Sequence, residues 1–238
     1  MSTFKERISS YPRPVFEHVE LTLPNLKRET IDGIRYYKIG DGEELKAFIS
    51  VTSITSNYSK EKIQEWRKRV GEDEANRVIK YATTLGTQYH GLVESYFKNE
   101  TVPEKSPMAM FLFANARKIL NRIGRIFIIE KPLYSPYWEL AGTPDMIAEF
   151  DGVLSVIDHK TSEFPKKEEW IEGYFVQCFA YAMMYAELFG DMPKQLVIIM
   201  SCQNGEVVTY IKKDLSVYSK ILRKYVNKFI QDKTNESL

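Results

Sequence analysis

The segment Gly142–Ser162 reads GTPDMIAEFDGVLSVIDHKTS and decides how the middle of the chain folds. Asp151-Gly152 is a dipeptide that favours a two-residue type I′ turn between two antiparallel strands. If Phe150 faces Val153 across that turn, every pair further out follows, because side chains alternate between faces with a period of two. The predicted pairs are Met146 with Ile157, Ile147 with Val156, Ala148 with Ser155, and Glu149 with Leu154.

This register gives the hairpin one apolar face and one face that carries charge. Every second residue from Met146 to Phe150, with its partner, forms a face suited to packing under helices. On the other face Asp145 lies directly opposite Asp158, and Lys160 follows two residues later on the same side. Two carboxylates placed ~5 Å apart repel each other by roughly 3 kcal/mol at an effective dielectric of about 20.

A bound divalent cation turns this repulsion into attraction, because magnesium and manganese prefer carboxylate oxygens. Such a metal polarises a phosphoryl oxygen and lowers the pKa of a bound water. The ammonium group of Lys160 can orient the nucleophile or stabilise the charge of the transition state. We therefore predict a metal-dependent phosphodiester-cleaving site at Asp145, Asp158 and Lys160.

The alternative is that both aspartates sit on exposed strand ends and that Lys160 makes a surface ion pair with one of them. The flanking sequence argues against this. Leu154-Ser155-Val156-Ile157 runs directly into Asp158, so the charges follow a strand that reads as buried, and buried charges need partners.

The sequence offers further candidates for this site. Gly86, His90 and Glu94 share one helical face, and Gly86 would let that helix approach the sheet closely. A His–Glu pair at this spacing is more often a capped or salt-bridged surface feature, but Gly86 favours His90 as a metal ligand, and Glu94 is the weaker candidate. Glu130 follows an apolar strand and either binds the metal through water or points to solvent.

A second pair lies on the helix that follows the hairpin. Gln177 and Tyr181 are four residues apart and share a face. They are either ordinary polar helix positions or a pair that holds a phosphate or sugar and stacks a base of a single strand.

The remaining pattern predicts a mixed α/β fold, with a central mixed sheet flanked by helices. We expect the first ~50 residues to be irregular or short strand, with turns at Asp32-Gly33 and Asp41-Gly42. Helices are expected over residues 60–98 (broken near Leu85-Gly86-Thr87), 107–123, 168–189 and at the C-terminal end, and strands over 34–39, 125–134, 140–150, 153–161, 196–201 and 207–212.

Composition narrows the class of protein. The chain has 238 residues, of which 44% are hydrophobic and 27% charged, and its net charge is +1, so any nucleic-acid groove must come from locally arranged Lys and Arg. No apolar run approaches the ~20 residues of a membrane helix, and the N-terminus lacks the pattern of a secretory or transit peptide, so we expect a cytoplasmic protein. Cys178 and Cys202 are expected to be buried free thiols.

Four motifs in this order resemble the RecB-like branch of the PD-(D/E)XK nucleases, and within it the mitochondrial genome maintenance exonuclease and its phage-type relatives. The motifs cover roughly Gly86 to Tyr181. They are Gly86-Thr87 with His90 and Glu94, Gly142-Thr143-Pro144-Asp145, Asp158-His159-Lys160-Thr161-Ser162, and Gln177 with Ala180-Tyr181; Glu130-Lys131-Pro132-Leu133 also has a counterpart.

The resemblance implies a restriction-endonuclease-like core in a single nuclease domain over residues 1–238, with 1–58 an N-terminal extension and 60–123 a helical part packed on the core. It implies an Mg²⁺- or Mn²⁺-dependent DNA exonuclease acting on single strands or flaps. Asp145, Asp158, His90 and the backbone carbonyl of His159 would bind metal and Lys160 would be catalytic. Supporting or substrate-binding roles fall to Gln177, Tyr181, Glu130, Thr161 and Glu94.

Three readings of the function stay open from the sequence. The first is an exonuclease in replication, repair or recombination, which suits a phage or bacterial enzyme working in the bacterial cytoplasm. The second is an endonuclease with the same site, and the third a non-catalytic DNA-binding module, whose usual sign would be a missing Asp or Lys in the motif. Two cysteines cannot supply a four-cysteine iron–sulfur cluster, so that subgroup of RecB-like nucleases is excluded.

Overall fold

The hairpin predicted at Asp151-Gly152 lies at the centre of the larger sheet. The computed structural model describes residues 13–236 except 41, 43 and 44. In it β7 (Met146–Phe150) pairs antiparallel with β8 (Val153–Ser162) in the predicted register, from Phe150 opposite Val153 to Met146 opposite Ile157. Asp151 and Gly152 have φ values of 52° and 76°, as a type I′ turn requires. The register prediction is confirmed.

The larger sheet is mixed and has the strand order β10-β9-β8-β7-β4. Its other strands are β4 (Ile123–Ile129), β9 (Gln195–Cys202) and β10 (Val207–Lys212). Only β8 and β9 run parallel, and every residue of β9 is buried. The strand that carries Asp158 and Lys160 is therefore the middle strand, covered on both faces.

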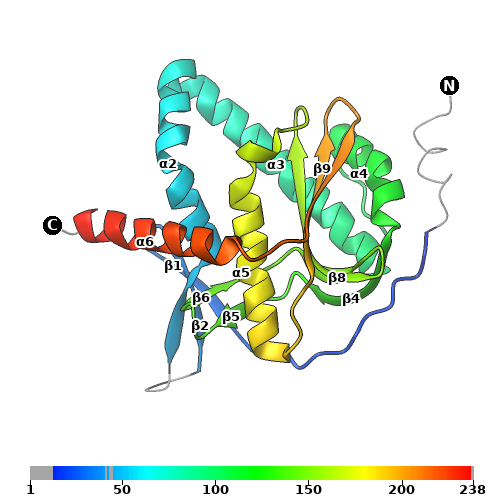
Figure 1. Ribbon diagram of the computed structural model, residues 1–238. Helices are drawn as coiled ribbons and strands as arrows, with labels where there is room; N and C mark the ends of the chain where they lie inside the picture. Colours follow the sequence, from blue (N-terminus) through cyan, green and yellow to red (C-terminus); the bar gives the residue numbers. More distant parts are fainter. Residues whose placement is uncertain (1–12, 41, 43–44, 237–238) are drawn as a thin grey trace.

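A second mixed sheet, of order β1-β2-β3-β6-β5, lies beside the first (Figure 1). It consists of β1 (Lys27–Ile31), β2 (Ile34–Ile39), β3 (Lys46–Ser50), β5 (Leu133–Ser135) and β6 (Leu140–Gly142). In the first ~50 residues, where we expected irregular structure or short strands, β2 matches the predicted range 34–39, and β1 and β3 are further short strands.

The predicted mixed α/β fold with helices packed on a mixed sheet is confirmed. The segments 125–134 and 140–150 are not single long strands, because each is divided between the two sheets. The division falls at Pro132 and Pro144, and proline has no N–H for a strand ladder. The connections after β4 and before β7 consequently lie outside the paired strands. Glu130 and Asp145 lie in these two connections.

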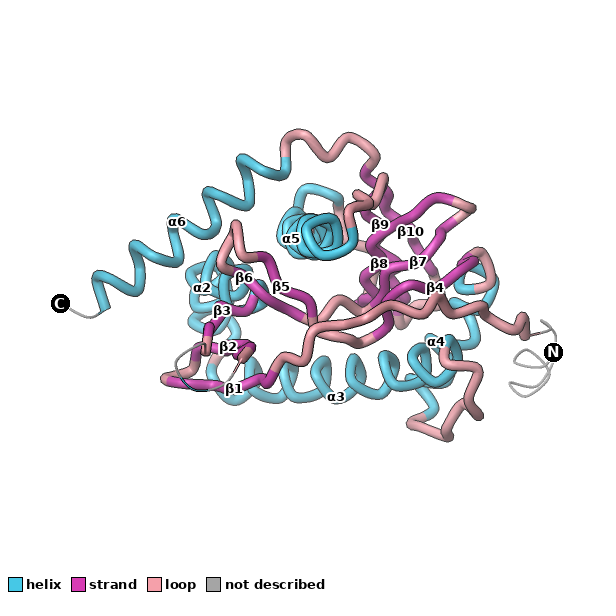
Figure 2. Tube along the Cα trace, turned by 90° about the horizontal axis from the view of Figure 1, so that it is seen from below, coloured by secondary structure: helices cyan, strands magenta, loops and turns pink. Residues whose placement is uncertain are grey.

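Helices cover both faces of the larger sheet (Figure 2). On one face α5 packs against Ile147 and Val156, and on the other α3 and α4 pack against Met146 and Ile157. The predicted apolar face of the hairpin is thus core. The helices are α2 (Val51–Val70), α3 (Glu72–Phe97), α4 (Pro107–Leu120), α5 (Glu172–Phe189), preceded by a 3₁₀ turn over Glu168–Trp170, and α6 (Tyr218–Glu236), which packs on α2 and α5.

Two predicted helix boundaries were wrong. The first helix begins at Val51 rather than residue 60, and the break lies at Gly71, which has a φ of 89°, rather than near Leu85-Gly86-Thr87. A single glycine inside a long amphipathic helix costs only about 1 kcal/mol, so tertiary packing carries α3 through Gly86. His90 therefore lies on an uninterrupted helix that spans the sheet.

Some expectations concern residues outside the described part. The turn at Asp41-Gly42 falls on residue 41, and the pattern expected at the N-terminus falls on residues 1–12. Cys178 and Cys202 are buried free thiols, as expected. In the part of the chain that the structure describes, none of the helices has both the length and the apolar character needed to cross a bilayer.

Gly142, the last residue of β6, packs directly against the ring of Tyr181 on α5. A Cβ atom at Gly142 would lie 2.6 Å from Cε1 of Tyr181, closer than van der Waals contact allows. At Gly86 a Cβ would meet only Oγ1 of Thr161 at 3.7 Å, which is ordinary contact. A side chain at Gly86 would therefore be tolerated, so the expected close approach of the helix to the sheet does not require a glycine there. At Gly142 a side chain would collide with the Tyr181 ring.

We predict that Gly142→Ala lowers the free energy of unfolding by about 1–3 kcal/mol, because the buried Tyr181 ring would have to move. The matched control Gly86→Ala should leave stability unchanged or raise it by up to about 1 kcal/mol, because alanine is the better helix former. Urea unfolding of both variants measures the difference. Equal stability of the two variants would contradict the packing argument.

Candidate active site

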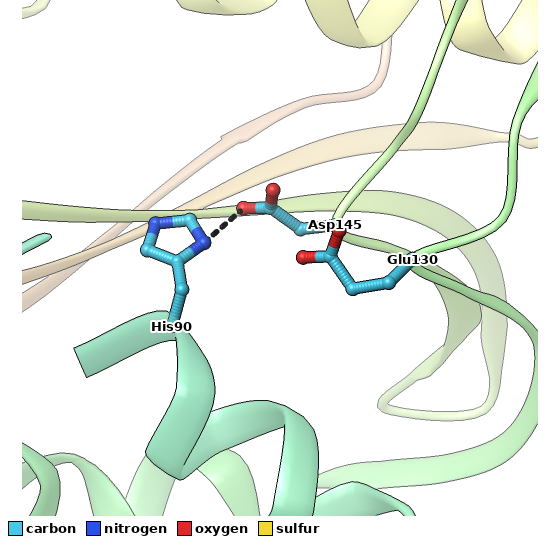
Figure 3. Close-up of side chains that lie close together, drawn as sticks. All are labelled: His90, Glu130 and Asp145. Atoms are coloured by element: carbon cyan, nitrogen blue, oxygen red, sulfur yellow. Dashed lines mark ion pairs between the residues drawn. The ribbon is translucent and has the colours of Figure 1, made fainter. Parts of the chain in front are cut away.

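Three side chains from separate elements converge at the ends of β4 and β7 (Figure 3). His90 comes from α3, Glu130 from the connection after β4, and Asp145 from the connection before β7. Each offers one ligand atom, and the three atoms lie within 4.8 Å of one another. One imidazole nitrogen and two carboxylate oxygens at this spacing suit a divalent cation.

Asp145 is held by backbone and side-chain contacts. Its Oδ2 accepts a hydrogen bond from the backbone N–H of His159 at 2.7 Å and lies 3.5 Å from Nδ1 of His90. Its backbone oxygen accepts from the N–H of Glu130 at 3.2 Å. Burial alone would raise the pKa of Asp145, but His90, Lys160 and the His159 N–H outweigh burial and lower it. Asp145 is therefore an ionised anchor.

The geometry of the two aspartates differs from the prediction in one respect. The ladder between β7 and β8 ends at Met146 and Ile157, so Asp145 lies outside it and is not a cross-strand partner of Asp158. Pro144 precedes Asp145 and ends the strand there. Freed from the ladder, the Asp145 carboxylate reaches the β8 backbone and α3.

Asp158 and Lys160 form a tight ion pair on β8. Nζ of Lys160 lies 2.6 Å from both carboxylate oxygens, and the Asp158 side chain is only 2% exposed. Burial raises the pKa of Asp158 to about 6, against the opposing effect of Lys160. Burial alone would lower the pKa of Lys160, but Asp158 and Asp145 raise it, so the ammonium stays charged. The alternative of a solvated surface ion pair does not fit this burial.

Glu130 lies in the convergent group rather than at an open sheet edge. Its backbone has a φ of 47°, in the left-handed region, which few non-glycine residues adopt without compensating contacts. Burial, followed by the nearby Asp145, raises the pKa of Glu130 to about 8. The carboxyl of Glu130 is thus protonated near neutral pH, beside the ionised Asp145. A cation that binds there would displace this proton and take the carboxylate as a ligand.

A small cavity of about 10 Å³ lies among these groups, with room for about one water or ion. His159 lines it, is 2% exposed, and has two ring nitrogens with no hydrogen-bond partner among the described residues. Burial lowers the pKa of His159 to about 3, so the ring is neutral. The ligand atoms of His90, Glu130 and Asp145 and the volume of the cavity both fit a divalent cation.

The other predicted residues surround this centre. Glu94 lines the cavity and also pairs with Lys98 at 2.5 Å. Gln177 donates a hydrogen bond to the hydroxyl of Tyr181 at 3.3 Å. Tyr181 is only 1% exposed, which leaves no face of its ring open for stacking a base, so that expectation was wrong. Thr161 follows Lys160 and lies against Gly86.

Sequence reasoning gave no role to Tyr174 and weighed Glu130 too lightly. The Nζ of Lys160 lies 5.1 Å from the centre of the Tyr174 ring, which is on α5. No spacing links residues 160 and 174, because the contact depends on how α5 crosses β8. For Glu130 the available signal was an acid directly after an apolar strand and before Lys131-Pro132.

The fold is consistent with a restriction-endonuclease-like core, because it has two mixed sheets with helices packed against them. The acidic residues and Lys160 lie at the end of the central hairpin, as such a core would place them. Among curated proteins the chain is distantly similar to mitochondrial genome maintenance exonuclease 1 of Mus musculus, at 30% identity over 111 residues, and of Homo sapiens, at 25% over 151 residues. The relatives are PD-(D/E)XK nucleases of the RecB-like branch, so the resemblance is confirmed as a distant one.

These matches cover 44% and 60% of this chain, and 32% and 39% of the two relatives. The chain thus matches between about a third and two fifths of the length of these relatives. No family model matches it.

We predict that Mn²⁺ stabilises the wild-type protein through His90, Glu130 and Asp145, by about 2.7 kcal/mol when the metal is at 100 times its dissociation constant. His90→Ala should lose most of this gain, because one of the three ligands is gone. Thermal unfolding with and without Mn²⁺ measures it. His18→Ala is the matched control, since His18 bonds the Phe97 carbonyl outside the group. An unchanged Mn²⁺ effect in His90→Ala would refute the ligand set.

Glu130 predicts a pH dependence in the metal-free protein. Its pKa is raised from 4.5 to about 8, so between these values the folded chain holds a proton that the unfolded chain has released. This contribution to stability is full below pH 4.5 and is lost as the pH rises to 8. Relative to wild type, Glu130→Gln should therefore become progressively more stable across this window.

Urea unfolding in EDTA at several pH values checks this. Glu65→Gln, at an exposed position on α2, is the control, and its free energy of unfolding plotted against pH should run parallel to that of the wild type. A parallel curve for Glu130→Gln as well would show that Glu130 is not buried in its acid form.

Proposed function

We propose that this chain is a metal-dependent DNA nuclease that hydrolyses phosphodiester bonds, working as an exonuclease on single-stranded or flap ends in replication, repair or recombination. The observation that carries the proposal is the convergence of His90, Glu130 and Asp145 on one ion-sized cavity, next to the buried pair of Asp158 and Lys160. The distant similarity to proteins named as exonucleases supports the mode of action.

The proposed metal is Mg²⁺ or Mn²⁺. His90, Glu130 and Asp145 would hold it, with Asp158 and the His159 carbonyl as the further ligands that the family resemblance implies. When bound, such a cation supplies Lewis-acid polarisation of a phosphoryl oxygen and an acidified water. A nitrogen ligand beside the oxygens suits manganese at least as well as magnesium.

Lys160 acts through its charge. Because Asp158 and Asp145 raise its pKa, the ammonium is protonated at neutral pH and serves as a hydrogen-bond donor rather than a general base. It can orient the attacking water or stabilise the charge that develops on the phosphoryl oxygens. Asp158 holds the Lys160 ammonium by an ion pair, and the ammonium lies over the ring of Tyr174.

The supporting residues keep this arrangement in place. Gln177 lies half-buried on α5 and bonds to Tyr181, whose ring packs on Gly142 just before Asp145. Thr161 continues β8 beside α3. We assign both Gln177 and Thr161 to positioning, and Glu94 to the rim of the cavity.

Lys160→Gln should reduce cleavage of labelled single-stranded DNA in Mn²⁺ by about 100-fold or more, because a preorganised cationic donor is lost. Lys118→Ala, an exposed lysine on α4, is the matched control and should cleave like wild type. Circular dichroism of each variant checks that it is folded. Wild-type activity in Lys160→Gln would remove Lys160 from the mechanism, and an inert wild type under several metals would overturn the nuclease proposal.

Exonuclease action predicts that a covalently closed single-stranded circle stays intact while the linear strand is degraded. Gel analysis of both substrates with wild-type protein and Mn²⁺ shows this directly. Cutting of the circle would favour the endonuclease alternative with the same active site. Labels at the 5′ or the 3′ end then report the direction of degradation.

A further inference from the structure

Exposed aromatic side chains lie on segments that adjoin the carboxyl end of β8. Phe164 is 59% exposed, Trp170 is 65% exposed, and both lie in the segment that directly follows the strand carrying Asp158 and Lys160. Tyr81, on α3, is 50% exposed. Single exposed rings are ordinary, but several on segments that adjoin a candidate site point to an interaction surface.

Hydrogen bonds bring Tyr81 to this segment. Its hydroxyl donates to Oε1 of Gln203 at 3.4 Å, and the backbone N–H of Gln203 donates to the oxygen of Ser162 at 2.9 Å. Ser162 is the last residue of β8, so α3, the turn between β9 and β10, and the segment after β8 meet there. We call Tyr81, Phe164 and Trp170 the aromatic platform.

Lysines lie over aromatic rings of the same segment and of α5. The Nζ of Lys167 is 5.5 Å from the Trp170 ring, and the Nζ of Lys166 is 5.5 Å from the Tyr174 ring. Tyr174 also lies under the Nζ of Lys160 at 5.1 Å. A row of cations thus runs from the platform to the proposed catalytic lysine.

Hydrogen bonds already order the segment between β8 and α5. The N–H of Trp170 donates to the oxygen of Lys167 at 3.0 Å, and the N–H of Ile171 donates to that of Glu168 at 3.1 Å. The hydroxyl of Tyr210 donates to the oxygen of Lys166. A ligand of the platform would therefore meet a surface that needs little rearrangement.

Carboxylates are also present, and they limit which partner fits. Glu168 is engaged by Lys212 in an ion pair, while Glu163 and Glu169 are exposed. Because carboxylates and lysines both occur in this segment, its overall charge does not attract a polyanion. A nucleic acid would be held by contacts to individual lysines and by stacking of its bases on the rings. That combination is how proteins bind single strands, whose bases offer open faces, whereas the faces of bases in a duplex are covered.

We propose that the aromatic platform stacks the bases of single-stranded DNA, that Lys166 and Lys167 contact its phosphates, and that the strand is thereby led to Lys160. This inference rests on the proposed nuclease function, because it assigns a substrate path to that site. It also places base stacking on exposed rings, in place of the buried Tyr181.

The test is binding of a fluorescein-labelled oligothymidylate in EDTA, followed by fluorescence anisotropy. Phe164→Ala and Trp170→Ala should each raise the dissociation constant at least about fivefold, since each loses a stacked base. Trp170→Phe should keep most of the affinity because it keeps a ring. Tyr137→Ala is the matched control: Tyr137 is an exposed aromatic loop residue next to Trp138, outside the platform, and its loss should change nothing.

The lysines are tested by the salt dependence of the same binding. Lys166→Ala and Lys167→Ala should each lower the slope of log Kd against log salt by about 0.7, the value for one phosphate contact on a single strand. An unchanged slope in both variants would remove the phosphate contacts.

Two results would overturn the platform itself. One is that Phe164→Ala and Trp170→Ala bind the oligothymidylate as tightly as wild type. The other is that they lose affinity for a blunt duplex to the same extent as for the single strand, which would exclude stacking on open bases.

Failure of this inference is distinguishable from failure of the proposed function. A wild-type chain that cleaves DNA in Mn²⁺ while its platform variants bind normally overturns the platform alone. A wild-type chain that binds the single strand through the platform but never cleaves it overturns the nuclease assignment alone.

Discussion

The hydrogen bond from the backbone N–H of His159 to the carboxylate of Asp145 holds the site together. It joins the connection before β7 to the middle strand, and the same oxygen meets His90 on α3. The backbone of Asp145 also receives the N–H of Glu130 at the end of β4. One residue therefore joins α3, the end of β4, the start of β7 and the interior of β8. Its placement depends on the hairpin register and on Pro144, which releases it from the ladder.

The charges around this anchor do not behave alike. Two basic side chains and a backbone N–H keep Asp145 ionised, whereas burial raises the pKa of both Glu130 and Asp158. The metal-free centre thus holds a proton on Glu130 near neutral pH and another on Asp158 below about pH 6. Binding of a cation would release these protons, which couples metal affinity to pH. Lys160 offsets part of the remaining negative charge.

Much of the local organisation could be predicted from sequence. The Asp151-Gly152 turn was sufficient for the register of β7 and β8, because a two-residue turn sets the first cross-strand pair and the pairs further out follow from it. That Asp158 and Lys160 lie on the same side of one strand followed from their spacing, whereas their ion pair is a finding of the structure. The two-sheet arrangement was missed, because a strand interrupted by a proline reads in sequence as one long apolar segment.

By itself the sequence determined the hairpin, its apolar core face and the residue types of the site, since these depend on turn chemistry and on periodicity over a few residues. Only the tertiary structure decided that Glu130 joins His90 and Asp145, that Tyr181 is buried, and that Tyr174 covers Lys160. Those contacts join segments far apart in the chain. They depend on how α3 and α5 cross the sheet, and no local pattern encodes that crossing.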